Sequence, residues 1–213
     1  MRFESRADAA RRLAAALEHY RGRRPLVLAV PRGAVEMGAI LAERLQGDLD
    51  VVLVRKLGAP GDPEFAVGAV DETGWTYVAE HAAQAGAEPA YLEREIERQL
   101  AELRRRRARY TPGRAPLDPA GRIAIVVDDG IATGASMIAA LHAVREKNPE
   151  RLVCAVPVAA AETLARVRRY ADEIVCLEVP IGFHAVSQFY RDFPQVGDDE
   201  VVRLLEEARH KAS

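Results

Sequence analysis

The most informative part of the sequence is an apolar run that ends in two acids and a loop of small residues. The apolar residues Ile123–Val127 are followed directly by Asp128 and Asp129. The loop after them leads into a helical pattern and consists mostly of small residues and hydroxyls: Gly130, Ala132, Thr133, Gly134, Ala135 and Ser136. Small side chains leave backbone N–H groups accessible, and the N-terminus of a helix adds partial positive charge. This pattern predicts a binding site for an anion such as a phosphate group.

Two adjacent carboxylates beside a phosphate site require a second kind of ligand group. Asp128 and Asp129 would repel a bare anion, but they can accept hydrogen bonds from hydroxyl groups or bind a divalent metal ion. A phosphate at one end and a cis-diol at the other describe a ribose 5-phosphate. The alternative is an ordinary strand-to-helix turn in which the two acids cap the helix. No Gly-Lys-Ser/Thr follows the loop, so the pattern does not favour an ATPase.

The elements that must position this stretch alternate between apolar strands and helices. Five short apolar runs predict strands, at residues 26–30, 50–54, 123–127, 152–156 and 174–177. Apolar residues at helical spacing predict helices near residues 5–20, 35–45, 135–146 and 162–170. Strands that are apolar on both faces and separated by helices indicate a parallel sheet covered on both sides. We therefore expect a three-layer, doubly wound α/β fold of about six mostly parallel strands, with one antiparallel edge strand.

Two segments do not follow this alternation. Residues 65–79 are typical of a hairpin, and a charged helix at about 88–110 and a proline-rich stretch follow it. Residues 180–196 carry four aromatic side chains between the last strand and the last helix. We expect one domain over residues 1–213, with a core at about 24–179, an inserted hairpin and helix at about 59–120, and a hood and C-terminal helix at about 180–213.

The composition excludes several classes of protein. Of 213 residues, 49% are hydrophobic and 29% are charged, and 30 Lys and Arg stand against 32 Asp and Glu. These values are typical of a globular protein, whereas a nucleic-acid binder is usually more basic. Charges stand where a signal peptide needs an apolar run, and Cys154 and Cys176 indicate neither a disulfide framework nor a zinc site. We therefore expect a cytoplasmic protein whose partners include neither membranes nor nucleic acid.

The acid pair and its loop resemble a known family. The sequence VVDDGIATGAS, residues 126–136, resembles the signature of type I phosphoribosyltransferases for 5-phosphoribosyl 1-pyrophosphate (PRPP). The resemblance covers about residues 26–179 and implies the fold of that family with a small hood. It implies that residues 130–136 line the PRPP site, with Thr133 to Ser136 at the 5-phosphate. It also implies that Asp128 and Asp129 bind the ribose 2- and 3-hydroxyls.

Three further features stand in the order that this family uses. Pro31, Arg32, Gly33 and Ala34 resemble its pyrophosphate loop. Arg55 and Lys56 resemble the basic pair near the leaving pyrophosphate, and the segment after Gly58 takes the place of the flexible catalytic loop. Its glycines and prolines, over residues 57–63, suit either a hinged loop or a rigid connector. The resemblance implies that the catalytic residues are Lys56, Arg32 and Asp129. It also implies Mg²⁺ bound through PRPP, with Asp128 or Asp129 as the candidate protein ligands.

The late aromatic segment resembles the base pocket, or hood, of 6-oxopurine phosphoribosyltransferases. By that resemblance, Phe183 stacks on the acceptor base and Arg191 contacts pyrophosphate. The alternative is that these aromatics pack the last helix. One departure from the 6-oxopurine enzymes is Ala132, which stands where they carry an acidic residue just before Thr-Gly. Together with the shorter hood, this leaves adenine, a pyrimidine or an acceptor outside nucleobase salvage open.

More narrowly, three stretches resemble a group of stand-alone bacterial phosphoribosyltransferase-like proteins of unassigned substrate: PRGAVEMG, DVVLVRKLGAPGDPEFAVGAV and FYRDFPQV. The resemblance implies a transferase of nucleotide metabolism that moves phosphoribosyl from PRPP to a nitrogen heterocycle and releases pyrophosphate, working as a homodimer. One alternative is a non-catalytic PRPP or nucleotide sensor on the same fold. Another is an enzyme other than a transferase that handles ribose 5-phosphate, such as a PRPP-dependent phosphatase or a pyrophosphorylase-like protein. The run Arg104–Arg107 indicates an ion-paired, solvated helix face, with a subunit contact or RNA patch as the alternatives.

Overall fold

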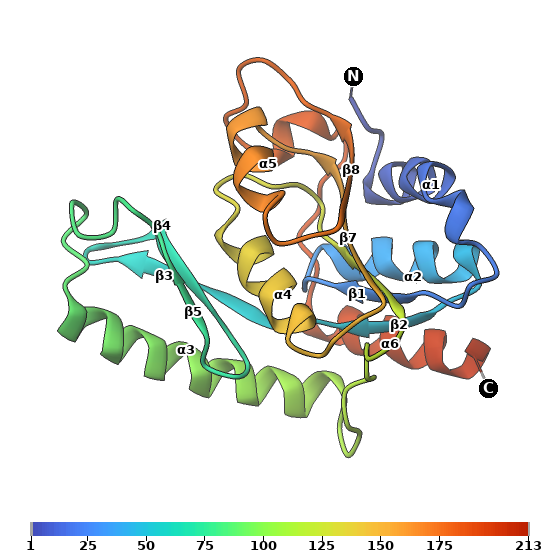
Figure 1. Cartoon of the computed structure of the whole chain (residues 1–213), viewed down its shortest axis with the longest axis horizontal. Coiled ribbons are helices and arrows are strands. Elements are labelled where there is room, and N and C mark those ends of the chain that lie inside the picture. The colour runs from blue at the N-terminus through green and yellow to red at the C-terminus, as the bar shows by residue number, and fades with distance from the viewer. Residues whose placement is uncertain (1, 213) are drawn as a thin grey trace.

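A five-stranded parallel sheet forms the centre of the protein, whose computed structural model describes residues 2–212. The strand order is β2-β1-β6-β7-β8, and every pairing is parallel. The strands are β1 (Leu26–Ala29), β2 (Asp48–Val51), β6 (Ile123–Val127), β7 (Arg151–Val158) and β8 (Glu173–Glu178). Figure 1 shows this sheet between its covering helices. The predicted α/β fold class with a mostly parallel sheet is therefore confirmed.

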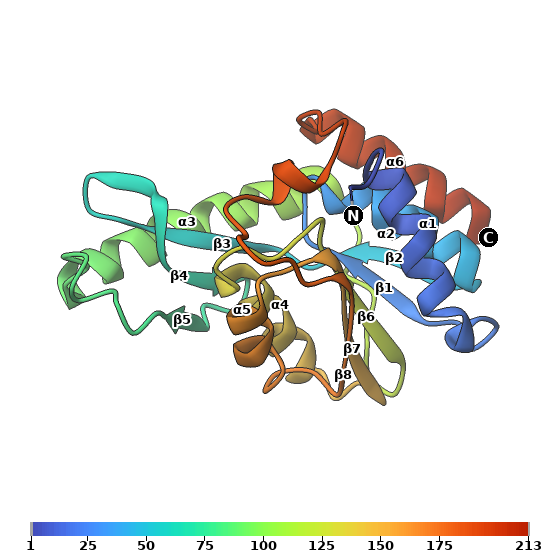
Figure 2. The ribbon, with the colours of Figure 1, turned by 90° about the horizontal axis from the view of Figure 1, so that it is seen from above.

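Six α-helices surround the two sheets: α1 (Arg6–Ala16), α2 (Ala34–Leu45), α3 (Pro89–Tyr110), α4 (Ala135–Arg145), α5 (Ala161–Val167) and α6 (Asp198–Ala212). Figure 2 shows α1 and α2 on one face of the central sheet and α4 and α5 on the other. Successive strand residues point to opposite faces, so Val27 packs under α1 and α2 while Leu28 packs under α4 and α5. Both sets are buried, which explains the apolar runs. Within residues 2–212, no helix is long and apolar enough to cross a lipid bilayer.

A second, antiparallel sheet extends from the core and forms an arm with α3 (Figure 1). It consists of β3 (Val54–Ala59), β4 (Asp62–Asp71) and β5 (Thr76–Val78). The expected antiparallel edge strand of the central sheet is therefore replaced by a separate sheet, because these strands pair with each other through short turns. The hairpin expected at 65–79 is present as β4 and β5. The division of the chain into core, insertion and hood stays a prediction.

The segment at residues 57–63, expected as a hinged loop or a connector, belongs to the β3–β4 hairpin. Its register shifts around Gly58, where an added Cβ would lie 2.6 Å from the backbone of Pro63. Gly61, at the tip, has φ +80°, a conformation that favours glycine. The glycines therefore serve a bulged, tight hairpin in this structure.

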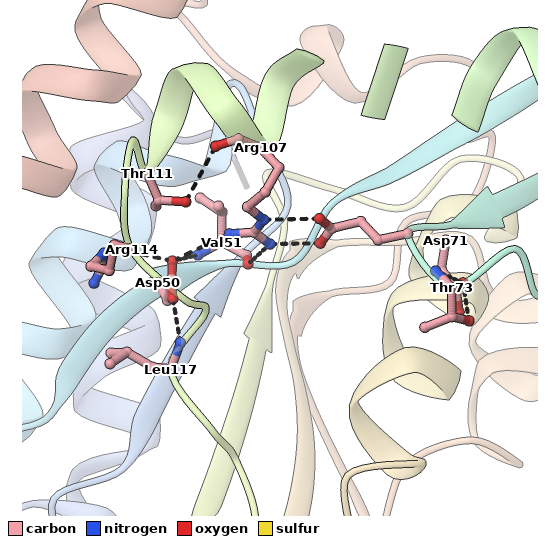
Figure 3. Close-up of polar contacts among 9 residues, drawn as sticks. Asp50, Val51, Asp71, Thr73, Arg107, Thr111, Arg114 and Leu117 are labelled. Carbon is pink, nitrogen blue, oxygen red and sulfur yellow. Dashed lines mark hydrogen bonds and ion pairs between the residues drawn. The ribbon is translucent and has the colours of Figure 1, made fainter. Parts of the chain in front are cut away.

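Arg107 of α3 fastens the arm to the core (Figure 3). Its Nε and Nη2 donate to the two carboxylate oxygens of Glu72 at 2.8 and 2.6 Å, and Nη2 also donates to the Val51 carbonyl at 3.1 Å. Its Nη1 lies 3.7 Å from the carboxylate of the fully buried Asp50. Arg107 therefore joins α3, the β4–β5 turn and the end of β2.

The rest of the arginine run is divided between ion pairs and solvent. Arg105 and Arg106 both pair with Glu102 on the same helix, while Arg104 is exposed. Three of the four arginines are therefore held by acids within the chain, as the ion-paired interpretation of the run expected.

The N-terminal residues pair with the hood, the segment of residues 180–196 between β8 and α6. The Phe3 N–H donates to the Phe189 carbonyl and the Arg191 N–H donates to the Phe3 carbonyl, both at 2.8 Å. Phe3 and Tyr190 are almost fully buried and their rings lie 5.5 Å apart. The aromatics of this segment therefore pack partly on the start of the chain, a partner that neither sequence-based alternative included.

Candidate active site

A cleft of about 290 Å³ lies at the carboxyl ends of β1 and β6. Parallel strands end at one edge of the sheet, so the loops after them meet there. The residues that line the cleft include ten of those singled out from the sequence: Arg32, Gly33, Lys56, Asp128, Asp129, Gly130, Ala132, Thr133, Gly134 and Ser136. The structure therefore brings together the acid pair, the small-residue loop and two of the four predicted cations, Arg32 and Lys56.

The small-residue loop leaves four backbone donors without acceptors. Among the described residues, the N–H groups of Thr133, Gly134, Ala135 and Ser136 have no hydrogen-bond partner. They begin α4, where the N-terminal turn has no acceptors of its own. Ala135 is buried, so its contribution to the loop is this backbone donor rather than its side chain.

Two contacts with the α5 region fix the shape of this loop. Thr163 Oγ1 donates to the Ala132 carbonyl at 2.8 Å, and Arg166 Nη2 donates to the Thr133 carbonyl at 3.1 Å. Gly134 has φ +84°, and a Cβ there would lie 2.9 Å from Thr163. A Cβ at Gly130 would lie 2.7 Å from Val186 of the hood. Close packing therefore requires both glycines, and the backbone conformation of Gly134 also favours glycine.

The two acids differ in their partners. The Asp129 carboxylate accepts from Arg6 Nε at 2.8 Å, and the Asp129 carbonyl accepts from the Tyr190 hydroxyl at 2.6 Å. Asp128 Oδ1 accepts only the Asp129 N–H, at 2.8 Å, among the described groups. Each carboxylate therefore keeps one oxygen, Oδ2 of Asp128 and Oδ1 of Asp129, that no described donor occupies.

Burial raises the pKa values of both acids. Burial raises the pKa of the Asp128 carboxyl well above its usual value, and the neighbouring Asp129 raises it further, against the opposing effects of Lys56 and Arg6. Burial also raises the pKa of Asp129, and here Arg6 is the strongest opposing charge. In the protein without ligand, the charge of Asp128 is therefore balanced less well by neighbouring positive charges than the charge of Asp129.

The two cations of the cleft are exposed. Lys56 projects from β3, and Arg32 lies in the loop after β1 with its Nη1 3.8 Å from Asp198 of α6. The peptide bond between Pro31 and Arg32 is cis. Neither cation forms a short ion pair with the acids, so both are available to an anionic ligand.

Four of the residues predicted from the sequence do not line the cleft: Ala135, Arg55, Phe183 and Arg191. Arg55 donates from Nε to Gln99 Oε1 at 2.7 Å and lines a neighbouring cavity of about 590 Å³, which also borders Lys56. Phe183 stacks on Phe189, with ring centroids 5.4 Å apart. Arg191 is exposed and pairs with Glu4 at 3.2 Å. The roles of Arg55, Phe183 and Arg191 at the ligand stay predictions.

Sequence reasoning missed Arg6, Tyr190 as a hydrogen-bond donor, and Val186. Arg6 stands 123 positions before Asp129, and an arginine at the start of a helix carries no local signal of such a partner. Tyr190 was one of four aromatics in an irregular segment. Its position between two other aromatics gave no indication that its hydroxyl reaches the acid pair.

Residues 3–194 match the family model described as the phosphoribosyl transferase domain. The chain belongs to that family. Two proteins of Mycobacterium tuberculosis, from strains CDC 1551 and H37Rv, are each 44% identical to it over 207 residues, 97% of this chain. Both are provisionally named phosphoribosyl transferases. The chain spans about half the length of these curated relatives, 47%.

A solved structure matches almost the whole chain. The crystal structure of TT1426 from Thermus thermophilus is 48% identical, with a TM-score of 0.81, and the match covers 97% of this chain and 99% of that one. The resemblance inferred from VVDDGIATGAS is thereby confirmed at the level of family and fold.

Proposed function

We propose that this protein is a phosphoribosyltransferase that uses PRPP with Mg²⁺ and transfers its phosphoribosyl group to a nitrogen heterocycle, releasing pyrophosphate. One observation carries the proposal: a single cleft is lined by a loop with free N–H donors, an acid pair and two exposed cations. This arrangement matches a ligand with a phosphate at one end, a diol in the middle and a polyanion at the other end. Membership of the family supports the same ligand.

The phosphate end of the ligand fits the start of α4. The four free N–H groups at residues 133–136 suit the oxygens of a 5-phosphate, and the hydroxyls of Thr133 and Ser136 add two donors. The free oxygens of Asp128 and Asp129 then accept one ribose hydroxyl each. The acid pair therefore recognises the sugar rather than the phosphate.

Electrostatics dominates the proposed reaction. As the bond between ribose C1 and pyrophosphate breaks, positive charge grows on the sugar ring and negative charge grows on the leaving group. The carboxylates of Asp128 and Asp129 lie on the side of the sugar, while Arg32 and Lys56 supply positive charge for pyrophosphate. The same contacts hold the sugar in one orientation for the incoming nitrogen.

The donor set of the cleft fits Mg²⁺ that is bound mainly through the ligand. Among residues 2–212, no group of three His, Cys, Asp or Glu side chains is placed to hold a metal ion. Mg²⁺ typically takes one or two carboxylates together with substrate phosphates, and Asp128 and Asp129 are the carboxylates present. Bound in this way, the metal would neutralise charge on the leaving pyrophosphate.

The test is a pyrophosphate-release assay with PRPP, Mg²⁺ and a panel of purines, pyrimidines and other nitrogen heterocycles. We expect release that depends on one class of acceptor and disappears in the Asp128→Asn/Asp129→Asn double variant. Asp118→Asn, at an exposed acid outside the cleft, is the matched control. Calorimetry with PRPP separates the alternatives: tight binding without release for any acceptor favours a sensor, and absence of binding refutes the proposal.

A further inference from the structure

Arg6 is buried, although arginine is usually a surface residue. Only 6% of Arg6 is exposed, and it occupies the first position of α1. Its Nε donates to Asp129 Oδ2 at 2.8 Å and its Nη1 donates to the Pro194 carbonyl at 2.7 Å. Its guanidinium carbon lies 3.7 Å from the centre of the Phe193 ring. One side chain thus links the N-terminal helix, the acid pair and the hood.

These contacts leave little freedom to the Asp129 carboxylate. Arg6 is fixed by Pro194 and Phe193, and it occupies only Oδ2 of the acid. The Tyr190 hydroxyl holds the backbone of the same residue at 2.6 Å. A planar guanidinium with several fixed bonds orients its partner more strictly than a flexible ammonium group does. Oδ1 of Asp129 is therefore presented in one direction, with no described donor on it.

The pyrophosphate loop approaches this ion pair closely. A Cβ at Gly33 would overlap Asp129 Oδ2 and would lie 2.9 Å from Arg6 Nε and Nη2. Only a glycine fits at this place without moving the pair. The Arg6–Asp129 contact therefore lies where the acid pair and the loop at residues 31–34 meet, beside the cleft and not at a remote surface.

The two cations near Asp129, Lys56 and Arg6, differ in exposure and in bonding. The titratable groups near it are Asp128, Lys56, Tyr190 and Arg6. Of the two cations, Lys56 is exposed and available to pyrophosphate, whereas Arg6 is buried and already bonded to the acid. Removing the partner of a buried carboxylate strongly destabilises the folded protein. Arg6 is therefore the permanent counter-ion of Asp129.

We propose that Arg6 is a positioning residue: it holds the Asp129 carboxylate in the orientation that offers Oδ1 to a ribose hydroxyl of the ligand. The start of α1 thereby becomes part of the substrate site. This inference rests on the proposed function. The competing explanation is that Arg6 only clamps α1 to the hood through Pro194 and Phe193. The two explanations differ in one respect: if Arg6 positions Asp129, substituting Arg6 should change ligand affinity only while the Asp129 carboxylate is present.

A double-mutant cycle on ligand affinity separates them. Calorimetry would measure ribose 5-phosphate and PRPP with the wild type, Arg6→Gln, Asp129→Asn and the double variant. We expect Arg6→Gln to weaken binding about 10- to 100-fold in the wild-type background, the range for a hydrogen bond to a charged group. In the Asp129→Asn background, the same change should alter affinity less than about twofold, because the carboxylate is already absent. Equal losses in both backgrounds would establish the clamp and overturn the proposal.

Two further variants keep the test decisive. Arg11→Gln changes an exposed arginine on the same helix and should bind like the wild type. Arg6→Lys keeps the charge and the buried methylenes, so it addresses the case in which Arg6→Gln does not fold. One ammonium group lacks the planar fork that reaches both Asp129 and Pro194, so we expect partial recovery of affinity. Wild-type affinity of the Arg6→Lys variant with Asp129 intact would refute a role of the planar guanidinium in orienting the carboxylate.

The same measurements distinguish a failure of the proposed function from a failure of the proposed role of Arg6. If the wild type binds neither ribose 5-phosphate nor PRPP, the proposed function fails and the role of Arg6 fails with it. If the wild type binds and the cycle shows no coupling between Arg6 and Asp129, only the role of Arg6 fails.

Discussion

Replacing Asp128 with asparagine should stabilise the free protein while weakening its binding of ligand. Burial and the Asp129 carboxylate raise the pKa of Asp128 well above its usual value. The folded protein therefore holds this proton more tightly than the unfolded chain does. The stability contributed by such a group is present below the unfolded-state pKa and is lost as pH rises through the raised folded-state pKa. Above the unfolded-state pKa, the raised folded-state pKa of Asp128 thus lowers the free energy of unfolding relative to that of an uncharged side chain.

The size of the effect follows from what the Asp128→Asn substitution keeps and what it removes. The new side-chain amide would still offer an oxygen to the Asp129 N–H, a bond of 2.8 Å in the native site. The substitution removes the buried charge and the repulsion from Asp129. We expect a gain of about 0.5–2 kcal/mol, the range for relieving a strained functional site, or about 1–8 °C in Tm for a chain of this size. Affinity for ribose 5-phosphate should fall about 10- to 100-fold, because a charged acceptor for a hydroxyl is lost.

The assay is urea or thermal unfolding of both proteins from about pH 8 to about pH 5, with calorimetry at neutral pH. The stability gain should shrink towards acid pH, because the wild-type carboxyl then takes up its proton. Asp118→Asn, at an exposed acid, should give no gain at any pH. A variant that is less stable than the wild type at neutral pH, or a gain that grows in acid, would refute this account of the pair.

Three further substitutions test other parts of the structure. Thr133→Val should weaken ribose 5-phosphate binding about 2- to 10-fold in calorimetry by removing one donor, and unchanged affinity would contradict the phosphate assignment. Lys56→Ala should lower kcat roughly 100-fold while PRPP affinity changes less than about tenfold, if this cation acts mainly on the leaving group. Arg107→Ala should destabilise the protein by about 1–3 kcal/mol in urea unfolding, because it removes the hydrogen bonds to Glu72 and to the Val51 carbonyl, whereas the buried Asp50 keeps its contact with Arg114. Exposed Arg104→Ala should stay within about 0.5 kcal/mol of the wild type.

The sequence allowed the centre of the site to be predicted because its residues are contiguous. The strand, the acid pair and the loop at residues 123–136 lie within one strand–turn–helix unit, and the apolar run marks the strand without ambiguity. The loop at residues 31–34 follows β1, so the rule that parallel strand ends meet at one edge accounts for the position of Arg32. Lys56 reaches the same cleft from β3 of the antiparallel sheet, which that rule does not cover. Local patterns were sufficient wherever the chemistry is local.

Segments whose structure depends on pairing were harder to predict. Gly58 and Pro63 are poor strand formers, so residues 57–63 indicated a loop, yet they belong to a hairpin that tolerates them through a register shift. In the hood, no regular period shows which aromatic faces inward. Tyr190 is 1% exposed because it packs on Phe3 from the other end of the chain, a contact that no local pattern encodes.

The acid pair is incompletely neutralised in the protein without ligand, because only Asp129 is bonded to a cation. Arg6 is bonded to Asp129 and to the Pro194 carbonyl, so its guanidinium is not available to bind the pyrophosphate of a ligand. In the proposed reaction, positive charge for the leaving group would therefore come from the exposed Arg32 and Lys56 and from a metal ion bound through the ligand. A buried arginine or lysine side chain bonded to Asp128 would offset the cost of its charge, but it would also permanently occupy the oxygen that the proposed site leaves open to the ligand. Under the proposed function, the raised pKa of Asp128 is thus the consequence of keeping that oxygen free for substrate.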